Sequence, residues 1–283
     1  MTHTISASTS VSAAPSPAAA ASRPATRVLL ACGAAAGPLF LAVGIVGGLT
    51  REGFDFTRNA ISQLSLGDLG WIQVTGFFVA GALMLAGAIG VRRAVTAGPG
   101  RRAAPWLVGV FGASFLVSGV FAADPGAGFP VGTPDSPAPA LSAHGAVHMV
   151  AGMVGYLALC AAFLLLARHF AAERQRGWAL ACRLLPVGVL TGFVGSGASV
   201  LSFTAGAALG LAGLTAATVR LAPLVGPAGV DHVRPQKSSL PSNERKAWTT
   251  WPTQFRAPRT SPRSRRSTAA PSRNGRTSSA PPP

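Results

Sequence analysis

Charged side chains are scarce in this chain: only 11% of its 283 residues are Asp, Glu, Lys or Arg, against about 25% in a soluble domain. Lysine is missing altogether between Val28 and Pro227. The cysteines are only Cys32, Cys160 and Cys182, without a CxxC pair or metal-ligand spacing, so they predict buried apolar residues rather than disulfides or a zinc finger. No glycine-rich phosphate loop and no GxSxG element occurs, which leaves the chain without an established catalytic motif.

The chain instead contains several long runs without a charged residue. Five of them cover residues 28–49, 71–91, 104–123, 146–167 and 184–203. About 20 helical residues span the roughly 30 Å hydrocarbon core of a bilayer. The sequence therefore predicts an all-α integral membrane helical bundle whose main partner is the lipid bilayer. A sixth run, 204–227, is interrupted only by Arg220, which lies near its end and can snorkel to the headgroups.

The arginines are sorted between the connections. The 92–103 connection holds Arg92, Arg93, Arg101 and Arg102, and the 168–183 connection holds four more, whereas the 124–145 connection has no Lys or Arg. The positive-inside rule then places the N-terminus and the arginine-rich connections in the cytoplasm. The 51–70 and 124–145 loops face outward. A basic tail that also stays inside needs an even number of spans, so six are favoured over five.

The two ends differ in composition from the bundle. Residues 1–27 are mostly Ala, Ser, Thr and Pro and predict a disordered segment before a bundle at 28–227. Residues 228–283 hold 11 of the 24 Lys and Arg and predict a disordered tail. One interpretation is a tail that binds anionic lipid headgroups, or nucleic acid without specificity. The other is a frame-shifted end of a GC-rich gene.

Glycine pairs four residues apart recur within the runs, as in Gly33 and Gly37, Gly44 and Gly48, Gly188 and Gly192, Gly206 and Gly210. Small residues at this spacing let helix backbones approach closely in lipid. They predict a tightly packed bundle and say nothing about a substrate.

The 51–70 loop is unusually polar for its surroundings. A short interfacial helix is predicted after Thr57, with an apolar stripe of Ala60, Ile61 and Leu64. Trp71 follows as an interface anchor. The loop also carries two arginines, and charges next to lipid need partners. We therefore expect Arg51 or Arg58 to pair with Asp55 or Asp124.

The 124–145 loop contains a second group of polar residues. His144 and His148 are four apart, so a helix would present both imidazoles on one face, with Asp124 as a third ligand and Ser62 nearby. This pattern predicts a zinc site able to activate water. Two other interpretations stay open: the histidines form hydrogen bonds that close the bundle, or they have a proton-linked role.

Together the two loops predict a polar cap on the outer side of the bundle. The first functional interpretation is a membrane protein with a structural or binding role, whose cap takes a lipid headgroup or a small polar ligand. The alternatives are a metal-dependent membrane hydrolase and a small-solute or proton-coupled transporter. The candidate ligand-binding residues are Arg51, Asp55, Arg58, Ser62, Asp124, His144 and His148, of which the metal site would use His144, His148 and Asp124.

The two loops also resemble a known family. The stretch from Arg51 to Trp71, "REGFDFTRNAISQLSLGDLGW", the "DP" at Asp124 and the "HGAVH" at His144 resemble the bacterial domain-of-unknown-function 998 family over roughly residues 28–225. The matched positions are Arg51, Asp55, Arg58, Ser62, Leu64, Gly67, Trp71, Asp124, Pro125, His144, Gly145 and His148. The resemblance implies a multi-pass protein of the bacterial cell membrane, usually with six spans, and implies no established activity.

Overall fold

The computed structural model describes residues 17–98, 100–136 and 140–224 of the chain. The predictions for residues 1–16 and for the basic tail lie outside these described residues. Six helices in the described part are long and apolar enough to cross a membrane. They are α1 (Pro17–Thr50), α2 (Gly70–Ala94), α3 (Ala103–Val120), α4 (Ala143–Ala172), α5 (Arg176–Val194) and α6 (Val200–Leu221). The all-α membrane fold class is thus confirmed, with six spans.

The first helix begins earlier than the sequence predicts. α1 starts at Pro17, so residues 17–27 are helical and the predicted disorder of 1–27 is wrong for this part. Alanine has the highest helix propensity, and the segment "PAAAA" opens the helix. Proline is accepted at the first helical position, where its missing N–H would have no helical partner.

The boundary between the last two spans also differs from the prediction. The uncharged run 184–203 is interrupted by the short 3₁₀ helix η2 (Gly195–Gly197). Glycine and serine favour turns over helix interior. The hydroxyl of Ser199 then accepts a hydrogen bond from the Leu201 N–H at 3.2 Å and caps α6. The sixth span is therefore a regular helix, with Arg220 in its last turn.

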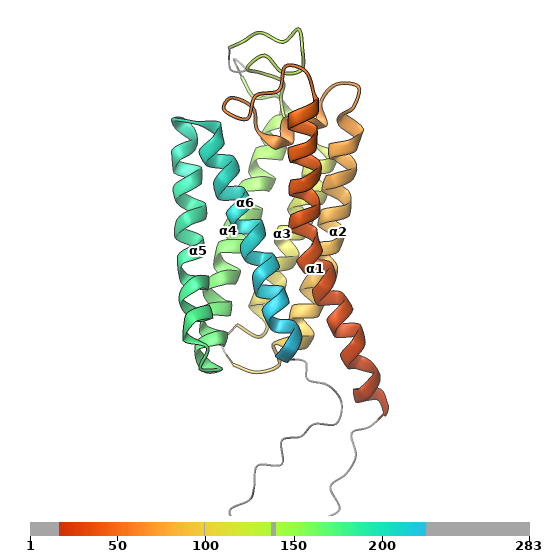
Figure 1. Ribbon diagram of the computed structural model, residues 1–283, viewed down its shortest axis with the longest axis vertical. Coiled ribbons are helices and arrows are strands. Elements are labelled where there is room, and N and C mark those ends of the chain that lie inside the picture. Colours follow the sequence, from red (N-terminus) through yellow and green to blue (C-terminus); the bar gives the residue numbers. More distant parts are fainter. Residues whose placement is uncertain (1–16, 99, 137–139, 225–283) are drawn as a thin grey trace, which may run out of the picture. The chain divides into compact units, whose positions relative to one another are not determined.

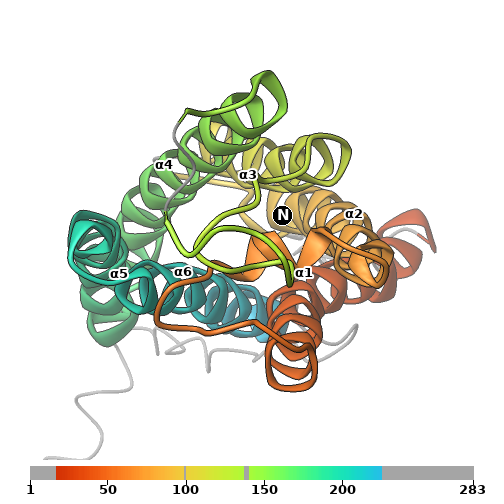
Figure 2. The same cartoon turned by 90° about the horizontal axis from the view of Figure 1, so that it is seen from above.

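The six helices form a closed ring, seen from above in Figure 2. Each helix packs against its neighbours in the chain, and α6 packs against α1 to close the ring. The inside is aromatic. The Phe77 ring of α2 lies 4.8 Å from that of Phe40 on α1 and 5.6 Å from that of Phe115 on α3, measured between centroids. Phe77 therefore marks the interior of the ring.

The two ends of the ring are chemically different. The α2–α3 and α4–α5 connections lie at one end, together with the start of α1 (Figure 1). Arg92 and Arg93 occupy the last turn of α2, and Arg176 is the first residue of α5. The 51–69 and 121–136 segments lie at the opposite end. The arginines thus gather at one end of the bundle, as the sequence predicts.

Glycines bring neighbouring helices into backbone contact. A Cβ atom on Gly87 of α2 would lie 2.6 Å from the Cα atom of Gly33 on α1, and a Cβ on Gly192 of α5 would lie 2.6 Å from the Cα of Gly206 on α6. These positions confirm the predicted close approach. Gly44 differs, because the space beside it is filled by a loop side chain, Ile61, rather than by a helix.

Candidate functional site

Two loops meet at the end of the ring that has few arginines. We call residues 51–69 and 121–136 the cap. Its first loop contains a 3₁₀ helix, η1 (Ile61–Ser65), that packs on α1 and α2. Ile61 and Leu64 are buried against Gly44 and Gly47 of α1. The predicted apolar stripe is thus present, although the helix begins at Ile61 and is 3₁₀ rather than starting at Thr57.

Arg51 fastens the first loop to the end of α1. Its Nη1 and Nη2 atoms donate to the carbonyl oxygens of Leu64 and Leu66, each at 2.6 Å. Its guanidinium also lies 4.9 Å from the centroid of the Phe129 ring, a cation–π geometry. Burial lowers the pKa of Arg51, and the charge of Asp68 partly opposes this. Of the two arginines expected to pair with Asp55 or Asp124, Arg51 instead donates to these two backbone carbonyls.

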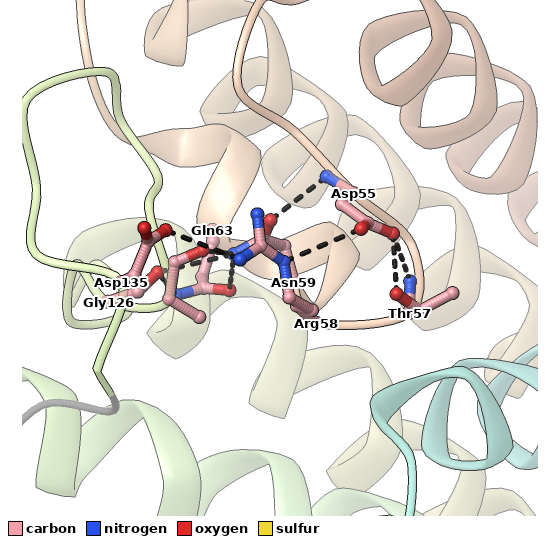
Figure 3. Close-up of polar contacts among 8 residues, drawn as sticks. Asp55, Thr57, Arg58, Asn59, Gln63, Gly126 and Asp135 are labelled. Carbon is pink, nitrogen blue, oxygen red and sulfur yellow. Dashed lines mark hydrogen bonds and ion pairs between the residues drawn. The ribbon is translucent and has the colours of Figure 1, made fainter.

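Asn59 is the most deeply placed polar side chain of the cap, with an exposure of 0%. Its Oδ1 accepts a hydrogen bond from the Asp55 N–H at 2.9 Å. Its Nδ2 donates to the carbonyls of Gly126 at 3.2 Å and Ala127 at 3.3 Å, as Figure 3 shows in part. One amide therefore shapes the first loop and ties it to the second.

Gln63 supports the same junction from η1. Its Nε2 donates to the Asp124 carbonyl at 3.1 Å, and its Oε1 accepts from the Ala60 N–H at 3.0 Å. Sequence reasoning did not select Asn59 or Gln63, because amides are not typical of catalysis or metal binding. The available signal was two amides four residues apart in a polar loop.

An ionic group lies on the outer surface of the cap. Asp55 Oδ1 accepts hydrogen bonds from the N–H and the hydroxyl of Thr57, at 2.8 and 2.7 Å. Arg58 lies between two carboxylates, with Nε 3.4 Å from Asp55 Oδ2 and Nη1 3.3 Å from Asp135 Oδ1, as drawn in Figure 3. The Thr57 hydrogen bonds, assisted by Arg58, lower the pKa of Asp55. The predicted Arg58–Asp55 pair is confirmed, and Asp135 joins it.

The Asp124 carboxylate holds Ser142, the N-cap residue of α4. Its Oδ2 accepts from the Ser142 N–H at 2.9 Å and its Oδ1 from the Ser142 hydroxyl at 2.5 Å. The Ser142 oxygen in turn accepts from the Gly145 N–H at 3.0 Å and caps α4. Ser62, predicted nearby, contributes its carbonyl to the Ser65 hydroxyl at 2.7 Å.

The two histidines have different surroundings. His148 is 7% exposed, and its Nδ1 lies 2.8 Å from the Phe121 carbonyl. Its ring meets Phe77 edge to face, with the centroids 5.8 Å apart. His144 is exposed and lies against the Phe121 ring, at 5.3 Å. The structure thus matches the interpretation in which a histidine forms a hydrogen bond at the end of the bundle.

The predicted zinc site is not assembled in this arrangement. Within residues 17–98, 100–136 and 140–224, no three His, Cys, Asp or Glu side chains lie close enough together to hold a metal ion. The Asp124 carboxylate is already bonded to Ser142, and one nitrogen of His148 to Phe121. Asp124 and His148 therefore make separate hydrogen bonds at the α3–α4 end, and His144 is exposed.

This difference predicts unequal effects of alanine at the two histidines. We expect His148→Ala to lower the free energy of unfolding by about 1–3 kcal/mol, because it leaves the Phe121 carbonyl without its partner and removes a buried ring. His144→Ala, the matched exposed control, should change it by less than about 0.5 kcal/mol. Thermal and denaturant unfolding in detergent would compare them. Equal losses from both variants would contradict the assignment.

Comparison with known proteins places the chain in a family. Residues 34–229, more than half of the chain, match the family described as "Protein of unknown function (DUF998)". No curated protein and no solved structure matches the chain. The matched region contains both loops of the cap and five of the six helices in full. The chain belongs to the DUF998 family of membrane proteins.

Proposed function

We propose that this chain is a multi-pass protein of the bacterial cell membrane, with its cap outside and its N-terminus in the cytoplasm. Support comes from the arginine-rich connections at the end opposite the cap and from the tendency of arginines to stay on the cytoplasmic side. The cap then lies at the outer headgroup level, where polar ligands and lipid headgroups are within reach.

We propose further that the cap binds a zwitterionic lipid headgroup, one carrying a phosphate and an ammonium group. The observation that carries this proposal is the Arg58–Asp135 pair, in which the side chains are 48% and 84% exposed. Exposed ion pairs contribute only about 0–1 kcal/mol, so exchanging partners costs little. A headgroup phosphate would replace Asp135 at the Arg58 guanidinium, and its ammonium group would pair with Asp135.

The charge of the cap favours this class of ligand over a purely anionic one. Arg51 is committed to the Leu64 and Leu66 carbonyls, so Arg58 is the arginine of the cap with an accessible guanidinium. The carboxylates outnumber the arginines. They are Glu52, Asp55, Asp68, Asp124 and Asp135. The excess of carboxylates therefore attracts a ligand that has a positive group, and the phosphate of the same ligand can bind Arg58.

The other two interpretations are not carried forward. A metal-dependent hydrolase would need the three-ligand site that the described residues do not assemble. A transporter would be favoured by charged groups in the middle of a span, whereas Arg220 lies in the last turn of α6.

Native mass spectrometry on protein released from nanodiscs tests the headgroup proposal. With equal phosphatidylethanolamine and phosphatidylglycerol, we expect the wild type to retain phosphatidylethanolamine, and the Arg58→Gln/Asp135→Asn variant to retain it about fivefold less, since two exposed charge-assisted contacts are lost. Glu52→Gln is the control, because it changes an exposed cap charge for which no ion pair is described. Equal retention by all three proteins would refute ligand binding and leave the cap with a structural role alone.

A further inference from the structure

The outer surface of α5 and α6 carries an apolar groove that the cap does not use. Its volume is about 410 Å³, within the range of about 300–1,000 Å³ typical of ligand sites. The lining residues are Trp178, Ala181, Cys182, Leu184, Leu185, Leu209, Ala212, Gly213 and Ala216. Those from α6 fall at positions i, i+3, i+4 and i+7, so one face of that helix forms one side of the groove.

Small residues line the groove on both helices. They are Ala181 of α5 and Ala212 and Ala216 of α6, set among larger leucines. Leu184 and Leu209 are 58% and 40% exposed, so the groove opens outward from the bundle. In a membrane this face meets lipid tails, because α5 and α6 are both long and apolar enough to span.

An arginine lies one helical turn beyond the lining residues of α6. Arg220 follows Ala216 by four residues on α6 and therefore shares its face. Helical side chains lean toward the N-terminus of their helix, which directs Arg220 toward the groove. Among the described residues, the structure gives Arg220 no ion pair. Arg176 begins α5, two residues before the lining residue Trp178, and adds positive potential at the same end.

We propose that the α5–α6 groove is a binding site for an acidic phospholipid of the cytoplasmic leaflet. One acyl chain lies in the groove over Ala212 and Leu209, and the phosphate binds the Arg220 guanidinium. Tryptophan favours the headgroup level of a bilayer, which places Trp178 beside the lipid backbone. Apolar space ending at an arginine matches a lipid with an anionic head, since basic pockets between spans on the cytoplasmic side bind such headgroups. This site is independent of the cap and of the ligand proposed there.

Native mass spectrometry with phosphatidylglycerol and phosphatidylcholine as probes tests this site on the full chain. We expect the wild type to bind phosphatidylglycerol more tightly than phosphatidylcholine. Arg220→Gln should weaken phosphatidylglycerol about fivefold and phosphatidylcholine less, because the choline group offsets the charge of its phosphate. Arg93→Gln is the matched control, because it removes an arginine at the same end of the bundle but on α2. Equal effects of Arg220→Gln and Arg93→Gln would overturn the site in favour of diffuse attraction.

A second variant tests the groove itself. Ala212→Phe should fill it and weaken both lipids, whereas Ala82→Phe, at an exposed alanine of α2, should weaken neither. If Ala212→Phe leaves lipid binding intact but changes the fraction of dimer, the groove is covered by a second copy and the proposal fails. Intact lipid binding with no change in dimer fraction would also overturn it.

Discussion

Replacing Asn59 by leucine is expected to lower the free energy of unfolding by about 2–4 kcal/mol. Asn59 accepts a hydrogen bond from the Asp55 N–H and donates to the Gly126 and Ala127 carbonyls. Leucine has a similar side-chain volume but can make none of these hydrogen bonds. A buried polar group that loses its partner costs about 1–3 kcal/mol. Gly126 keeps a second donor, since its carbonyl also accepts from the Phe129 N–H at 3.2 Å, so the loss concentrates on Asp55 and Ala127.

Two measurements separate this effect from a general loss of stability. Unfolding in detergent gives the free energy, and hydrogen exchange of the amides in residues 51–69 shows whether the first loop has left the second. Thr57→Ala is the control, because it removes a hydroxyl that makes only an exposed hydrogen bond to Asp55, and it should cost less than about 1 kcal/mol. If Asn59→Leu is as stable as Thr57→Ala, then Asn59 does not hold the cap together.

Gly87→Ala is expected to destabilise the bundle by about 2–3 kcal/mol, although alanine favours helices by about 1 kcal/mol over glycine. The added methyl group would lie 2.6 Å from the Gly33 Cα atom and 3.2 Å from the Gly33 nitrogen. These are backbone atoms that no side-chain rotation can move, so α1 and α2 must separate and lose contacts along their length.

A second glycine supplies the matched control. Gly152 of α4 has no heavy atom within 4 Å of an added Cβ. Gly152→Ala therefore meets no neighbour and should stabilise the protein by a few tenths of a kcal/mol up to about 1 kcal/mol. Opposite signs for Gly87→Ala and Gly152→Ala in thermal unfolding are the expected result. A Gly87→Ala protein that is as stable as Gly152→Ala would mean that α1 and α2 do not cross at Gly33.

The membrane bundle could be predicted because its signals are properties of long segments. Uncharged runs of about 20 residues have few alternatives to spanning helices, and the arginine distribution orders their connections. The break before Ser199 was missed because Gly, Ser and Ala are also common inside membrane helices. The α1 start was missed because an Ala- and Pro-rich stretch reads as disorder by composition.

The location of the cap could be predicted from the sequence, but its hydrogen-bond partners could not. The order of the loops between the spans was enough to predict that the two polar loops lie at the same end of the bundle. The three-residue spacing was enough to predict that Arg58 pairs with Asp55. It was not enough to show that backbone carbonyls satisfy Arg51, since carbonyl directions depend on the tertiary fold. The spacing of His144 and His148 suggested metal ligation because it carries no information about the tertiary contacts. In the fold, His148 lies against the Phe121 carbonyl and the Phe77 ring.

Cysteine labelling in intact cells tests directly whether the chain spans the membrane with the cap outside. Glu52→Cys and Ala97→Cys would be made in a chain whose Cys32, Cys160 and Cys182 are replaced by alanine, and treated with a membrane-impermeant maleimide. We predict that Cys at position 52, in the cap, is labelled from outside, and that Cys at position 97, in the α2–α3 connection, is labelled only after lysis. Labelling of position 97 but not position 52 in intact cells would contradict the orientation, and equal labelling of both would contradict a bundle that spans the bilayer.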